Sequence, residues 1–171
     1  PVLRALPIKV RANGAVVPEA NGYIANHPGL KDARCVGNIG IQPDPDGQVR
    51  SVTLLARWQQ TYSPLLPLAM LECGGSHPVD VSILSSRLFS QPYWEVPFPR
   101  NWQAYTVVSA QDILSHRVNP QWLRARWVLV GSSALGLSDR ATTPLGDSVA
   151  GVMVRAAVLT ALLDQVENPP G

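Results

Sequence analysis

The run Arg126–Gly131 is apolar from Trp127 to Val130 and stops at a glycine. A strand that is buried on both faces has this pattern, because neither face alternates with polar side chains. The run therefore predicts a central strand of a parallel sheet. Further along the chain, residues 152–166 are apolar on nearly every side of a helix, with polar breaks at Arg155, Thr160 and Asp164. Such a pattern predicts a buried C-terminal helix.

Proline and glycine divide the rest of the chain into short pieces, with 16 prolines and 13 glycines in 171 residues. The frequent prolines and glycines disfavour a helical bundle and favour an α/β or α+β domain. We expect a mixed β-sheet with helices packed on it, and a single domain over residues 1–171. Residues 12–34 contain Asn-Gly and Pro-Gly turns and predict an irregular loop region.

Two β-branched segments, 36–41 and 49–55, flank an Asp-Gly turn and predict a β-hairpin. Asp44 and Asp46 lie in that turn. A calcium loop requires further oxygen ligands after the glycine, whereas Gln, Val and Arg follow Gly47. We therefore interpret the two aspartates as turn residues and expect no metal.

Further elements follow from local signals. Proline in a first turn, glycine at a helix end and the cap-like sequence that starts at Ser109 predict short helices. Alternating apolar residues predict strands. The predicted helices and helical turns cover residues 64–72, 109–114 and 120–123, and the predicted strands cover 6–10, 79–83, 93–98 and 104–108.

Composition excludes several classes of protein. Charged residues make up 15% of the chain, the net charge is +2 and no basic run occurs, so no nucleic-acid partner is expected. No apolar stretch approaches the roughly 20 residues that a membrane-spanning helix needs. Cys35 and Cys73 are the only cysteines, and either a single disulfide or two buried thiols is compatible with them. No cofactor is expected.

The loop after Gly131 is rich in glycine and serine, and α/β folds place ligands at such loops. Leu137 stands where a phosphate-binding loop needs lysine, and Ser133 stands where a dinucleotide loop needs glycine. Ser133 departs from the pattern of a hydrolase nucleophile, because Leu135 replaces the closing glycine and every histidine precedes it. No catalytic residue is therefore predicted.

Polar side chains of the same loop form the candidate ligand-binding site. Asp139 and Arg140 can recognise a polar ligand through charge-assisted hydrogen bonds. The same groups can instead pair with one another and with the backbone, and both interpretations remain open. The candidate ligand-binding residues are Ser132, Ser133, Asp139, Arg140 and Thr143.

Several segments, taken in order, resemble the type-two CHASE domain, an extracellular sensory module associated with cyclases and histidine kinases. The resemblance runs from about Asn38 to Leu163. It is carried by Asn38–Arg50, Pro67–Ala69, Val108–Leu114, Trp127–Arg140, Thr143-Pro144 and Gly151-Val152.

The resemblance implies an extracytoplasmic sensor, periplasmic or extracellular, of a bacterial membrane receptor. It implies flanking transmembrane helices, an intracellular kinase or nucleotide-cyclase output, and no catalysis. Family members begin with a strand and a Trp-Pro-rich stretch that do not occur here, so we expect the C-terminal portion of the domain. We also expect open sheet edges that the N-terminal half or another copy would cover. The family commonly has His-Ala where this chain has Arg155-Ala156, so no role of that imidazole carries over.

On these grounds we expect a signal-input domain that binds an unidentified small ligand or ion and forms a homodimer in the full receptor. The helix over residues 152–166 would lead toward a membrane helix. One alternative is a structural dimerisation module without a ligand. The other is a serine hydrolase that uses Ser133.

Overall fold

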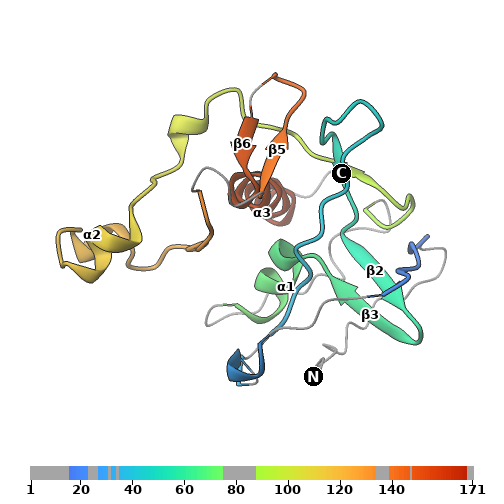
Figure 1. The fold of residues 1–171 in the computed structure, drawn as a ribbon, viewed down its shortest axis with the longest axis horizontal. Coiled ribbons are helices and arrows are strands. Elements are labelled where there is room, and N and C mark those ends of the chain that lie inside the picture. Colours follow the sequence, from blue (N-terminus) through green and yellow to red (C-terminus); the bar gives the residue numbers. More distant parts are fainter. Residues whose placement is uncertain are drawn as a thin grey trace.

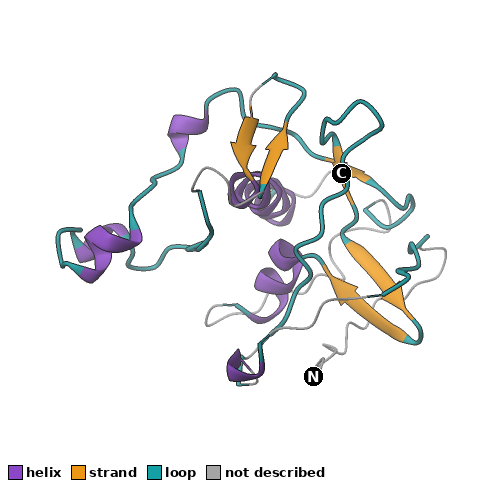
Figure 2. Cartoon of the chain, viewed as in Figure 1, coloured by secondary structure: helices purple, strands orange, loops and turns teal. Residues whose placement is uncertain are grey.

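The computed structural model describes residues 16–22, 27–30, 32–33, 35–74, 88–133, 139–146 and 148–168. Over these residues, helices and short strand pairs form one domain, which confirms the mixed α/β class (Figure 1). Connecting segments make up much of the chain between them (Figure 2). With η for 3-10 helices, the elements in chain order are η1 (Pro28–Leu30), β1 (Ser51–Val52), β2 (Leu55–Trp58), β3 (Thr61–Pro64), α1 (Leu66–Cys73), β4 (Trp94–Glu95), η3 (Trp102–Ala104), α2 (Ala110–Leu114), η4 (Pro120–Trp122), β5 (Arg140–Thr142), β6 (Ser148–Ala150) and α3 (Gly151–Glu167).

The described strands form three separate two-stranded antiparallel sheets instead of one mixed sheet. β2 pairs with β3, with Leu55 opposite Pro64. β5 pairs with β6, with Arg140 opposite Ala150, and the turn between these strands contains Gly146 at a φ of +83°. β1 pairs with β4, which lies more than 40 residues further along the chain.

Helix α1 confirms the prediction for residues 64–72. Pro67 lies in its first turn, where the missing proline N–H breaks no helical hydrogen bond. The helix ends at Cys73, and the N–H of Gly74 donates to the carbonyl of Met70 at 2.6 Å. Pro67, Leu68, Ala69 and Leu71 are all buried, so half of the residues of this short helix lie in the protein interior.

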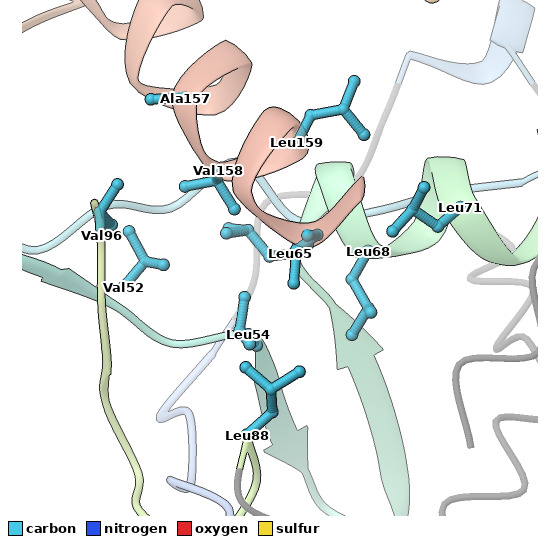
Figure 3. Packing of buried hydrophobic residues seen from close by; sticks show 11 residues of the cluster. Val52, Leu54, Leu65, Leu68, Leu71, Leu88, Val96, Ala157, Val158 and Leu159 are labelled. Carbon is cyan, nitrogen blue, oxygen red and sulfur yellow. The ribbon is translucent and has the colours of Figure 1, made fainter. Parts of the chain in front are cut away.

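The core lies between α1 and α3. Helix α3 covers the range 152–166 that the apolar pattern marks as a helix, and eight of its residues are buried. Val158 of α3 and Leu65 and Leu68 of the α1 region point into the same space (Figure 3). The other members of this cluster are Val52, Leu54, Leu71, Leu88, Val96, Ala157, Leu159 and Leu162.

Residues 106–126 form an excursion that lies away from the core and carries α2 and η4 (Figure 1). Ser109 caps α2, its Oγ accepting from the N–H of Asp112 at 3.0 Å, which confirms the predicted cap and helix. Asn119 caps η4 in the same way, which confirms the helical turn near residue 120. No residue of α2 or η4 is buried.

The predicted central strand at 126–131 is wrong. Residues 126–131 have no strand partner among the described residues, and Val130 is 90% exposed. Trp127 and Gly131 lie against the two helices instead of in a sheet. A Cβ on Gly74 would lie 2.5 Å from the ring of Trp127, and a Cβ on Gly131 would lie 2.5 Å from Cβ of Val152. The segment therefore runs from the C-terminal end of α1 to the first turn of α3.

The predicted hairpin of segments 36–41 and 49–55 is correct only in its turn. Gly47 has a φ of +82°, and its N–H donates to the carbonyl of Asp44 at 2.8 Å. The flanking segments pair elsewhere, since Asn38 bridges to Leu65 and Val52 pairs with Trp94. Distant partners thus outcompete the local pairing that a hairpin would make.

The predicted strand pair of 93–98 and 104–108 is also wrong. Only Trp94–Glu95 is a strand, and its partner is β1. Prolines on both sides lack the backbone N–H groups that donate hydrogen bonds between paired strands, so the strand is limited to these two residues. The predicted strands at 6–10 and 79–83 lie outside the described residues.

Cys35 and Cys73 form a disulfide, with Cα atoms 6.3 Å apart, and this settles the choice that the sequence left open. The bond joins the last residue of α1 to the segment that precedes Asn38 and Ile39. Among the helices that the structure describes, none has the length and apolar character to cross a membrane.

Candidate functional site

The first turn of α3 is where the candidate loop meets the core. Gly131 packs against the side chain of Val152, and the N–H of Gly151 donates to the carbonyl of Asp139 at 2.7 Å. Both ends of the loop between residues 131 and 139 therefore rest on the start of the same helix. The β5–β6 hairpin lies beside this helix (Figure 1).

Arg155 lies one turn into α3, and only 8% of its side chain is exposed. Its Nη1 lies 3.2 Å from Oδ2 of Asp139, and its Nη2 donates to the carbonyl of Ile39 at 2.5 Å. Its Nε is buried and has no hydrogen-bond partner. A buried guanidinium is stabilised by a carboxylate partner, because an uncompensated charge away from water is costly.

The carboxylate of Asp139 lies over the backbone of Gly151. A Cβ at position 151 would collide with Oδ1 of Asp139, so glycine is required for this close approach. A negative charge beside the first turn of a helix is favourable, because the helix dipole is positive there. Since 45% of the Asp139 side chain is exposed, the same carboxylate also faces solvent.

The other charged candidate, Arg140, points along its own hairpin. Its Nε donates to Oγ of Ser148 at 3.0 Å, and its Nη2 donates to the carbonyl of the same residue. These contacts join β5 to β6. The structure therefore separates the two charges that the sequence places side by side, because Asp139 turns toward α3 and Arg140 turns toward β6.

Thr143 is fully buried at the end of β5. Its Oγ1 accepts from the N–H of Leu145 at 3.3 Å, and its carbonyl accepts from the N–H of Gly146 at 3.0 Å. These bonds fit a residue that shapes the turn between β5 and β6.

Ser132 and Ser133 are both exposed and follow Gly131 at the first turn of α3. No hydrogen bond within the described residues joins Ser133 to His27 or His116, and His77 lies outside those residues. Of the five candidates, the structure brings Ser132, Ser133 and Asp139 to the start of α3. The ligand-binding role of the five residues remains a prediction.

Asp44 and Asp46 are both engaged by Arg50. Its Nη1 lies 2.7 Å from Oδ2 of Asp44, and its Nη2 lies 2.5 Å from Oδ2 of Asp46. The hydrogen bond from Arg50 lowers the pKa of Asp46 to about 2. These contacts fit the turn interpretation, and within the described part of the chain no three acidic, histidine or cysteine side chains form a group that could hold a metal.

Among the described residues outside this region, two buried polar atoms lack a hydrogen-bond partner, namely Oε2 of Glu72 and Nε1 of Trp102. Burial raises the pKa of the Glu72 carboxyl to about 6. Neither residue belongs to the motifs that the sequence singles out for function, and Glu72 is the one of the two whose charge responds to pH.

Sequence reasoning missed Arg155 as part of the site. The signal was a single arginine within a helix that is otherwise apolar on nearly every side. Such a residue must find a partner if the helix is buried. Its partners, Asp139 and the carbonyl of Ile39, lie 16 and 116 residues away along the chain, so sequence spacing does not identify them.

Comparison with protein families gives a match over nearly the whole chain. A family model, the CHASE2 domain, matches residues 4–171. No curated protein and no solved structure matches the chain.

Proposed function

The chain belongs to the CHASE2 family of extracellular sensory domains, and from this we propose that it is the signal-input domain of a bacterial transmembrane receptor. Its output would be an intracellular kinase or nucleotide cyclase. The family membership is the observation that carries the proposal. We further propose that the domain itself has no catalytic activity.

The disulfide supports an extracytoplasmic location. Structural disulfides persist in oxidising compartments such as the periplasm and the cell exterior, and they are rare in the reducing cytosol. The bond between Cys35 and Cys73 involves every cysteine of the chain. A domain that folds with this bond is suited to the outer side of the inner membrane.

Helix α3 is the element best suited to pass a signal on. Its buried side includes Val154, Val158 and Leu162, and the last two belong to the core cluster shared with α1. Packed cores do not deform continuously, so a change at one end of α3 displaces the helix as a unit. In the receptor, α3 would lead toward a membrane helix and would transmit such a displacement.

The stimulus that we propose is a small polar ligand or ion bound near the loop that contains Ser132, Ser133 and Asp139. A ligand that uses Asp139 or Arg140 must compete with their existing partners, Arg155 and Ser148. Competition for Asp139 would weaken its contact with Arg155 and so convert binding into a change of contacts on α3. A homodimeric receptor would provide a second copy of α3 for the same movement.

Cysteine labelling of the full-length receptor in intact cells tests the location. Leu114 is 80% exposed on α2, so Leu114→Cys presents a thiol without disturbing the core. We expect a membrane-impermeant maleimide to label Leu114→Cys in intact cells. A cysteine placed in the output domain, as the matched control, should react only after permeabilisation. Labelling of Leu114→Cys only after permeabilisation would exclude an extracytoplasmic domain.

A further inference from the structure

Arg155 connects three segments that are separate in the sequence. It belongs to α3, its Nη1 contacts the carboxylate of Asp139 at 3.2 Å, and its Nη2 donates to the carbonyl of Ile39. The neighbouring residue Asn38 bridges to Leu65 at the start of α1. One side chain thus links the candidate loop, α3 and the segment that adjoins α1.

The two ends of this link differ in their access to solvent. The guanidinium is enclosed, whereas 45% of the Asp139 side chain is exposed. A molecule in solution can therefore reach the carboxylate of Asp139, whereas the Arg155 side chain is shielded from solvent. Among the described residues Asp139 is the one ion-pair partner of Arg155, so loss of its carboxylate leaves a buried positive charge that these residues do not compensate.

The arrangement is incompletely satisfied as it stands. Nε of Arg155 is buried with no acceptor, and only one nitrogen of the guanidinium faces the carboxylate. A bidentate pair would use two parallel hydrogen bonds and would be stronger. The unmade hydrogen bond destabilises the observed position of Arg155. A shifted position of this side chain is therefore closer to it in free energy.

We propose that Arg155 is a positioning residue that couples the exposed carboxylate of Asp139 to the placement of α3. Loss of the Asp139 contact moves the guanidinium toward a new partner, and this movement shifts the first turns of α3 relative to the segment at Ile39. The inference rests on the proposed sensory function and adds the residue through which the loop acts. Its physical basis is one charged side chain shared by two packed segments.

Hydrogen exchange of the 171-residue chain tests the coupling. Asp139→Asn keeps the size of the side chain and removes its charge. We expect amide exchange to become about tenfold faster in the first turns of α3 and around Ile39, with exchange in β2 and β3 unchanged. The matched control is Asp112→Asn, which makes the same change in the exposed ion pair between Asp112 and Arg117, away from α3.

A second variant keeps the proposal testable if Asp139→Asn folds poorly. Asp139→Glu retains the charge, and we expect its exchange pattern to approach that of the wild type. Unchanged exchange at α3 and Ile39 in a folded Asp139→Asn chain would overturn the proposal. So would equal acceleration in every element of both variants, since that indicates general destabilisation.

The full-length receptor separates this inference from the function on which it rests. We expect Asp139→Asn to change the basal output of the receptor at least about twofold, with Asp112→Asn at the wild-type level. If the exchange result holds while the domain is labelled from the cytoplasm, the coupling is correct and the sensory proposal is wrong. If labelling is extracytoplasmic and output is unchanged by Asp139→Asn, the coupling has no signalling role and the inference fails.

Discussion

Cys35 and Cys73 are joined by a disulfide that spans 38 residues and fastens the end of α1 to the segment leading to Ile39. The bond encloses β1, β2, β3 and nearly all of α1. It therefore restricts the part of the unfolded chain that contributes Val52, Leu54 and Leu68 to the core.

Removal of the disulfide is expected to destabilise the domain strongly. In the chain-entropy model a loop of this length is worth about 4 kcal/mol, so the double variant Cys35→Ser, Cys73→Ser should lose about 3–4 kcal/mol of unfolding free energy. Urea unfolding of oxidised wild type and variant measures the difference. Reductant should destabilise the wild type and leave the variant unchanged. A wild type that is insensitive to reductant would contradict the prediction.

The contact between α1 and α3 is expected to dominate the packing energy. Leu68 and Leu162 are fully buried, one on each helix. Leu68→Ala and Leu162→Ala should each cost about 2–5 kcal/mol, because each leaves a cavity in a packed core. Leu114→Ala is the control, since that leucine is exposed and its truncation should change stability by less than about 0.5 kcal/mol. Chemical denaturation provides the comparison, and equal effects at all three positions would refute the assigned core.

Glu72 is expected to make stability depend on pH. Burial raises the pKa of its carboxyl from 4.5 to about 6, so the folded chain holds this proton more tightly than the unfolded chain. The resulting stability is complete below pH 4.5 and is lost as the pH rises to about 6. Because the group is only partly enclosed, solvent screening reduces the effect. Glu72→Gln should therefore raise the unfolding free energy at pH 7.5 by about 1 kcal/mol and have little effect at pH 4.

The control for this prediction is Glu95→Gln, because Glu95 is exposed on β4. Urea unfolding between pH 4 and 8 should give parallel curves for the control and the wild type. A Glu72→Gln curve that is parallel to both would show that Glu72 does not titrate in this range.

The cap of α2 is expected to act locally. Oγ of Ser109 accepts from the N–H of Asp112 and donates to its carboxylate at 2.7 Å. Ser109→Ala should destabilise α2 by about 1 kcal/mol, visible as faster amide exchange in residues 110–114. The global unfolding midpoint should hardly change, because no residue of α2 is buried. A large shift of that midpoint would mean that α2 is part of the core.

Local signals in the sequence predicted the helices well. Pro67 in a first turn and Ser109 at a cap act within four residues, so α1 and α2 follow from the sequence. The strand pairings did not follow, because the partner of Val52 is Trp94 and that of Asn38 is Leu65. Pairings of this kind depend on tertiary packing, which local β-propensity does not encode.

The sequence named the residues of the candidate site but did not predict their contacts. Gly131 and Asp139, at the two ends of the loop, lie against the first turn of α3. Asp139 and Arg140 are neighbours in the sequence, and the sequence does not indicate that they contact different partners, Arg155 and Ser148. The contribution of Arg155 depends on a carbonyl 116 residues earlier in the chain, which only the folded structure brings into contact.

The excursion at residues 106–126 has a consequence for how sequences of this kind can diverge. Neither α2 nor η4 contributes a buried residue, so insertions and deletions there leave the α1–α3 core intact. Residues 115–126 of this excursion also lie outside the segments that carry the family resemblance. We expect related domains to vary most in residues 115–126, which makes this part a suitable position for grafting a reporter peptide.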